Sequence, residues 1–164
     1  MRYFALLTLL SLLWIGCGNN ISAPTIPASP VTPSTIAATG LKSEENEFLK
    51  LINALRSESG LQSLTIDAAL QAAADHHSAY MVSFGTLSHF EPSPNSSSYD
   101  RILNEGGDFN FTGENVALNS GDAATTFDAW YSSPGHRENM LSEQFQYIGI
   151  SQKGSYWTTD FAGK

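Results

Sequence analysis

The stretch SPGHRENML, residues Ser133–Leu141, begins like a helix and carries a histidine in its first turn. Ser133 is a favourable N-cap, and Pro134 suits the first helical position because its missing N–H would have no partner there. His136 then lies where the positive end of the helix dipole disfavours imidazolium. A neutral imidazole donates from one nitrogen and accepts, or binds a metal, with the other. On this stretch alone, His136 either completes the start of the helix or takes part in chemistry.

The segments around this stretch predict helices first and strands later. The spacing of apolar residues predicts helices over residues 43–60, with Ser43 as N-cap, then 67–84, 99–104 and 122–132. GENVAL, residues 113–118, is typical of a short strand or an extended turn. Two apolar runs around Lys153 and Gly154 predict a C-terminal hairpin. This order indicates an α+β fold rather than a series of βαβ units.

Three further histidines precede this stretch. His76 and His77 are adjacent on the second predicted helix, so their side chains point in different directions. We predict that His77 lies at the edge of the core and His76 in solvent, and we assign chemistry to neither. His89 precedes a loop rich in proline and serine, so a buried helical position does not account for it.

The N-terminus has the pattern of an export signal. An apolar run after Arg2 ends at Cys17, and it is too short to span a bilayer comfortably. Its end resembles the lipobox of bacterial lipoproteins, which implies removal of residues 1–16 and lipidation of Cys17. Trp14 departs from that pattern, and the alternative is that Cys17 is an incidental residue of an uncleaved anchor. Because Cys17 is the only cysteine, no disulfide can form within the chain.

The segment 17–42 has the composition of a spacer between this anchor and the folded domain. Its prolines recur every third residue among Ser, Thr and Ala, which favours a semi-rigid polyproline II stalk. The formal net charge of the chain is −8, and it would become −9 without Arg2. That acidity argues against nucleic acid and against electrostatic docking on anionic lipid. The tether to the membrane would therefore be the acyl chains on Cys17.

The order of motifs resembles the CAP superfamily (cysteine-rich secretory proteins, antigen 5 and pathogenesis-related 1), in its bacterial SCP-like branch. The motifs that carry the resemblance are SHF at 88–90, GENVA at 113–117, AWYSSPGHRENML at 129–141 and a final aromatic strand, YWTTDFA. It covers about residues 45–164, and we assign residues 43–164 to this domain. The resemblance implies a three-layer α-β-α sandwich with a central antiparallel sheet. It also implies an extracytoplasmic place, on the cell surface or facing the periplasm.

The resemblance also implies a site. Family members have a cleft lined by two histidines and two glutamates, which in several of them holds a divalent metal, often zinc. His89, Glu114 and His136 match three of these positions, and Ser133 stands where the second glutamate is expected. Glu138 lies two residues past His136 on the predicted helix and should point away, so it does not fill the gap. Two imidazoles and a carboxylate would leave a zinc position open for water or substrate.

Several functions remain open at this level. A non-enzymatic module that binds a lipid, a metal or an envelope component requires no catalytic residues. A metal-assisted hydrolase would use His89, Glu114 and His136. A serine hydrolase would use Ser133, His136 and Glu114, although Ser133 is expected to cap its helix and no GxSxG elbow exists. In a purely structural alternative, the GEN motif holds the His89 loop against the sheet. We favour the binding module, and nothing in the sequence indicates an oligomer.

Overall fold

The computed structural model describes residues 40–119 and 122–164. These residues belong to a compact unit, Ile36–Lys164, that contains its own hydrophobic core. The predicted signal segment 1–16, Cys17 and most of the spacer lie outside the described residues. Among the described residues, no helix is both long enough and apolar enough to cross a bilayer.

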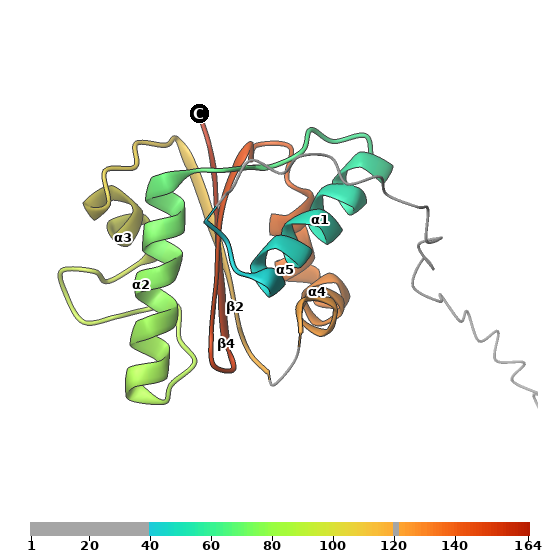
Figure 1. Ribbon diagram of the computed structural model, residues 1–164. Coiled ribbons are helices and arrows are strands. Elements are labelled where there is room, and N and C mark those ends of the chain that lie inside the picture. The colour runs from blue at the N-terminus through green and yellow to red at the C-terminus, as the bar shows by residue number, and fades with distance from the viewer. Residues whose placement is uncertain (1–39, 120–121) are drawn as a thin grey trace, which may run out of the picture. The chain divides into compact units, whose positions relative to one another are not determined.

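The fold is a three-layer α-β-α sandwich, as predicted (Figure 1). Helices α2 and α3 cover one face of the sheet, and α1, α4 and α5 cover the other. The helices are α1 Ser43–Glu58, α2 Ala68–Phe84, α3 Ser98–Asn104, α4 Ala123–Ser132 and α5 Pro134–Leu141. The strands are β1 Thr65–Ile66, β2 Phe111–Leu118, β3 Tyr147–Lys153 and β4 Tyr156–Gly163.

The sheet has the order β1-β3-β4-β2, so β2 forms one edge. The predicted hairpin is β3–β4, turning at Gly154 with a φ of 57°, and β2 pairs antiparallel with β4 along its whole length. The short β1 pairs parallel with β3, an element that the sequence did not indicate. The segment GENVAL is therefore strand and not turn.

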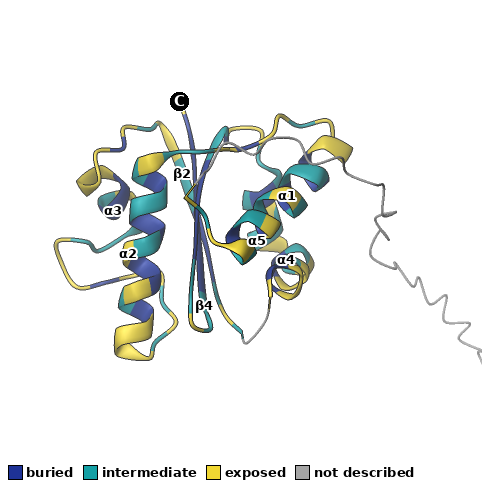
Figure 2. Ribbon diagram, in the orientation of Figure 1, coloured by how far each residue is buried: buried dark blue, intermediate teal, exposed yellow. Residues whose placement is uncertain are grey.

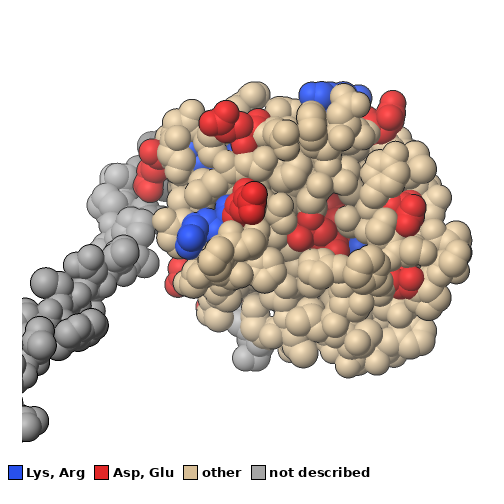
Figure 3. Space-filling model, turned by 180° about the vertical axis from the view of Figure 1, so that it is seen from behind, with Lys and Arg blue, Asp and Glu red and all other residues tan. Residues whose placement is uncertain are grey.

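The layers are held by an aromatic core on one face and small residues on the other. Phe48 of α1 meets Trp130 edge to face, with ring centroids 5.2 Å apart, and also contacts Trp157 of β4. On the opposite face, α2 buries the residues expected from its spacing, including His77. The buried residues form one stripe along each helix and lie on both faces of the central strands (Figure 2). Acidic side chains are scattered over the surface of the domain (Figure 3).

Two predicted caps differ from the structure. Helix α1 begins after Lys42, because the Asn46 N–H already bonds to the Lys42 carbonyl at 2.9 Å, so Ser43 is the first helical residue and not the N-cap. Ser133 does occupy the N-cap position of α5, but its hydroxyl makes no capping hydrogen bond. Its carbonyl accepts the Arg137 N–H at 2.9 Å, which is the first bond of that helix.

Candidate functional site

The site is built around a carboxylate–histidine pair. Glu114 lies in β2, and its Oε1 is 2.8 Å from Nδ1 of His89 in the loop that follows α2. The Glu114 side chain is buried, whereas that of His89 remains 48% exposed. The pKa of His89 is raised, chiefly by this hydrogen bond and despite partial burial. Because Nδ1 is engaged, Nε2 is the nitrogen of His89 that remains for a ligand.

Arg101 holds both members of this pair from α3. Its Nη2 donates to Glu114 Oε2 in a buried ion pair, and its Nη1 donates to the His89 carbonyl at 3.3 Å. The guanidinium therefore occupies the second oxygen of Glu114 while it anchors the loop. A carboxylate engaged on both oxygens is an orienting group rather than a free base.

A second carboxylate, Glu91, fixes the His89 loop to α2. Its two oxygens lie 2.7 Å from Nδ1 of His77 and 3.1 Å from Nε2 of His76. Nε2 of the fully buried His77 faces the Ser88 carbonyl at 2.7 Å. Both nitrogens of His77 therefore face oxygen atoms, which fixes the position of the ring. The two histidines to which we assigned no chemistry thus position the loop that carries His89.

Asp160 adds a third carboxyl group behind the pair. It is the cross-strand partner of Glu114 on β4, so the two side chains share a face of the sheet. Asp160 is fully buried, and no donor among the described residues reaches either of its oxygens. Burial and then the charge of Glu114 raise its pKa well above the ordinary value, against an opposing effect of Arg101. A protonated Asp160 can donate to Glu114, which accounts for the absence of another donor.

His136 lies on the other side of β2. Asn115, next to Glu114 in the strand, donates from Nδ2 to the His136 carbonyl at 3.0 Å, and the His136 ring lies 6.2 Å from that of Trp130. Burial and then the charge of His89 lower the pKa of His136. The two histidines therefore approach each other around the edge of β2, but within the described chain no hydrogen bond joins the His136 ring to His89 or Glu114.

This arrangement corrects the serine-hydrolase hypothesis. That hypothesis required Glu114 to orient His136 and His136 to activate Ser133. Glu114 instead orients His89. No hydrogen bond links Ser133 to His136 in the part of the chain that the structure describes. The predicted nucleophile, base and acid are thus not assembled.

The neighbouring polar residues of α5 have structural contacts. Asn139 donates from Nδ2 to Asn115 Oδ1 at 2.8 Å and to the Glu114 carbonyl at 3.2 Å. Arg137 donates to the Tyr131 carbonyl at 2.8 Å. Glu138 is exposed, in agreement with the prediction that it points away. Asn139 and Arg137 thus hold α5 against β2 and α4.

Glu114 is poorly placed for its predicted role as a metal ligand. A metal would have to compete with Arg101 and His89 for its two oxygens. Over residues 40–119 and 122–164, no three His, Cys, Asp or Glu side chains come together as a group that could hold an ion. With Glu114 engaged, only His89, through Nε2, and His136 would be left to hold a metal, and the described residues do not form a complete ligand set.

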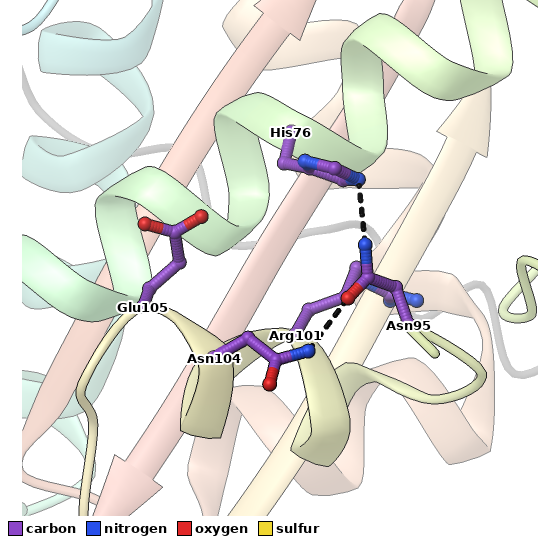
Figure 4. A pocket seen from close by; sticks show the side chains of 5 residues that line it. All are labelled: His76, Asn95, Arg101, Asn104 and Glu105. Atoms are coloured by element: carbon purple, nitrogen blue, oxygen red, sulfur yellow. Dashed lines mark hydrogen bonds between the residues drawn. The ribbon is translucent and has the colours of Figure 1, made fainter. Parts of the chain in front are cut away.

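A small hollow lies beside Arg101, between α2 and the start and end of α3 (Figure 4). Its lining residues are His76, Asn95, Arg101, Asn104 and Glu105. Asn95 bridges the hollow's rim, with hydrogen bonds to His76 and Asn104. The volume is about 100 Å³, below the several hundred typical of pockets for organic ligands. It suits water or one small polar group.

Four residues of the site were not indicated by the sequence: His77, Glu91, Arg101 and Asp160. Three of them, Glu91, Arg101 and Asp160, carry an ionisable side chain that is buried in the structure, a rare condition unless the group is paired or neutral. An isolated Arg in a short helix, or an Asp in a terminal strand, gives no such signal in one sequence. Only the juxtaposition of α2, α3, β2 and β4 makes them neighbours.

Comparison with known proteins gives a consistent result. The model of the cysteine-rich secretory protein family (CAP) matches residues 49–161. The uncharacterised protein YkwD of Bacillus subtilis is 31% identical over 148 residues, which are 89% of this chain and 57% of YkwD. The uncharacterised membrane protein YlbC of the same organism is 31% identical over 117 residues, 71% of this chain and 34% of YlbC. The chain thus spans less than two thirds of either relative.

Two solved structures share the fold. An extracellular protein containing an SCP domain from Bacillus anthracis has a TM-score of 0.70 and 30% identity, over 74% of this chain and 40% of that one. An outer surface protein of Borrelia burgdorferi has a TM-score of 0.69 and 22% identity, over 75% of this chain and 94% of its own. At that lower identity the second likeness concerns the fold alone.

Proposed function

This chain belongs to the cysteine-rich secretory protein (CAP) family, and from that premise we propose that it is an extracytoplasmic binding module tethered to a bacterial membrane. Two similar proteins support the location, since the protein of Bacillus anthracis is extracellular and YlbC is a membrane protein. The lipobox-like sequence ending at Cys17 supports the tether. The binding site is the cleft of His89, Glu114 and His136, and its ligand is a lipid, a metal or an envelope component.

The observation that favours binding over catalysis is the state of Glu114. Both of its oxygens are engaged, one by Arg101 and one by His89. A general base needs a free oxygen within reach of the proton that it removes. Glu114 instead holds His89 with Nε2 outward, and His136 lies around the strand edge with a lowered pKa. The pKa of His89 is raised and that of His136 is lowered. A pair in which one imidazole is more readily charged and the other stays neutral suits an acidic or hydrogen-bonding head group.

A titration with a long-chain fatty acid tests this site. We would follow the imidazole signals of residues 36–164 by NMR while adding oleate below its micelle concentration. We expect saturable shifts of His89 and His136, with affinity reduced at least about tenfold in His89→Ala and His136→Ala. Glu138→Ala, an exposed change on the same helix, is the matched control. Saturable binding that both histidine variants retain would place the ligand elsewhere and overturn the proposed site.

Metal-assisted hydrolysis is the second candidate, and one observation supports it. In metal centres, a carboxylate commonly accepts the far N–H of a ligating histidine, as Glu114 does from His89. A bound zinc would supply a Lewis acid and an activated water. Calorimetric titration of residues 36–164 with zinc tests it. Stoichiometric zinc binding that is lost in His136→Ala would favour this candidate. Heats no greater than those of dilution would show that zinc does not bind, and the binding module would remain the proposed function.

The tether has its own test. Mass spectrometry of the full chain, expressed in a bacterium and extracted from its membranes, should give a protein that begins at Cys17 and carries acyl groups. Cys17→Ser should remain unprocessed and unlipidated. A wild-type chain that retains residues 1–16, or that is cleaved without lipid, would contradict the lipid anchor.

A further inference from the structure

The end of α2 and the loop after it expose an unusual amount of apolar surface. Val82, Phe84, Leu87 and Phe90 are all among the large hydrophobic side chains that remain exposed, and Phe84 and Phe90 are 68% and 67% exposed. We call residues 82–90 the apolar segment. Tyr80 extends it, with its ring 4.6 Å from that of Phe84. Single exposed hydrophobic residues are ordinary on protein surfaces, whereas several in one short segment indicate a contact surface.

The same part of the chain lacks charge. Residues 76–90 contain no Asp, Glu, Lys or Arg, although the chain as a whole has a net charge of −8. Asp75, just before this stretch, is bonded to Lys153 and Ser151. An apolar and uncharged end on an acidic domain fits a neutral surface, because an anionic surface or a second acidic copy would be repelled by the rest of the domain.

We propose that the apolar segment docks the domain on the surface of a bilayer rich in neutral lipid. Phenylalanine and leucine side chains insert at the boundary between head groups and acyl chains, and their contribution does not depend on opposite charge. This inference rests on the proposed tether, which would keep the domain beside a membrane. Residues 18–39 would reach about 70 Å if fully extended as polyproline II, whereas α2 is only about 26 Å long. The tether thus permits such an orientation.

The docking would place the binding cleft at the lipid surface. His89 lies within the apolar segment, between Leu87 and Phe90. The loop is held to the domain through His77, Glu91 and Arg101, so an inserted loop would carry the His89–Glu114 pair with it. A ligand would then enter the cleft directly from the head-group layer.

Vesicle flotation tests the docking without the tether. Residues 36–164 would be mixed with vesicles of phosphatidylcholine and floated at 0.1 M and 0.5 M NaCl. We expect the wild-type unit to float at both salt concentrations. Phe84→Ser with Leu87→Ser should reduce partitioning at least about tenfold, since these two side chains supply much of the apolar area that would leave water. Leu103→Ser with Phe111→Ser, two residues of comparable exposure in α3 and β2, is the matched control.

Three results would overturn the docking. The wild-type unit could stay unbound, the two double variants could lose binding equally, or binding could require anionic lipid and vanish in high salt. Sedimentation of each protein checks for self-association, and a dimer that only Phe84→Ser with Leu87→Ser dissociates would identify a second copy as the occupant instead. Because the unit tested lacks Cys17, failure here leaves the lipid anchor and the cleft to their own tests.

Discussion

At the scale of single residues, the surroundings of His89 and His136 shift the pKa values of the two imidazoles in opposite directions. Glu114 bonds to His89 and raises its pKa, whereas burial and the charge of His89 lower the pKa of His136. NMR titration should therefore show His89 deprotonating at higher pH than His136. The ion pair with Glu114 stabilises the fold below the unfolded pKa of histidine and is lost as pH rises through the raised folded pKa. Glu114→Gln should bring the His89 pKa down, and an unchanged His89 pKa in that variant would contradict this account.

Asp160 differs from His89 in that its charged form destabilises the fold. Its folded pKa is raised by burial and by Glu114, so the wild-type fold loses stability as pH rises from the unfolded pKa of Asp, about 4, toward the folded value. The slope is about 1.4 kcal/mol per pH unit in that window. Asp160→Asn, which keeps the shape and a donor toward Glu114, should lack this dependence and be more stable than wild type at pH 8. Urea unfolding at pH 4, 6 and 8 measures it. Parallel pH curves for the two proteins would refute a protonated Asp160.

At the scale of elements, Arg56 joins α1 to the segment around α5. Its buried guanidinium donates to the carbonyls of Met140, Ser142 and Phe145, with a fourth bond from Nε to Gln62. Arg56→Met removes every donor and leaves buried carbonyls without partners, so we expect a loss of at least about 3 kcal/mol in unfolding free energy. Lys50→Met on the same helix breaks only an exposed pair with Glu47 and should cost less than about 1 kcal/mol. Similar losses in the two variants would show that Arg56 does not hold these elements together.

At the scale of the whole molecule, the approach of α2 to the sheet depends on Gly149. A Cβ at this position of β3 would lie 2.1 Å from the backbone carbon of Leu70, so the helix would have to move away. We expect Gly149→Ala to cost about 3 kcal/mol or more. Gly135→Ala in α5, where an added Cβ meets nothing within 4 Å, should change stability by less than about 1 kcal/mol. Calorimetric Tm values give the comparison, and a Gly149→Ala protein as stable as Gly135→Ala would show that the layers are not in close contact there.

The sequence was sufficient for the helices, the C-terminal hairpin and the family, but not for the short strand β1. Apolar spacing located α1, α2 and α4, turn residues located the β3–β4 hairpin, and the GENVA and SPGHR motifs indicated the sandwich. These features are local, because helix and strand periodicity and turn chemistry act over a few residues. His89 and Glu114 are hydrogen-bonded, whereas their place in a ligand-binding cleft stays a prediction.

Only the tertiary structure shows that β2 separates Glu114 from His136, and which residues hold the site together. Neighbouring residues of a strand point to opposite faces, so Glu114 turns toward α2 and α3 while Asn115 turns toward α5 and His136. His77, Glu91, Arg101 and Asp160 lie in different segments of the chain, and their buried ionisable side chains become meaningful only once three elements and a loop bring them together. Pairing between distant side chains depends on packing distances and on exclusion of water, which local sequence patterns do not encode.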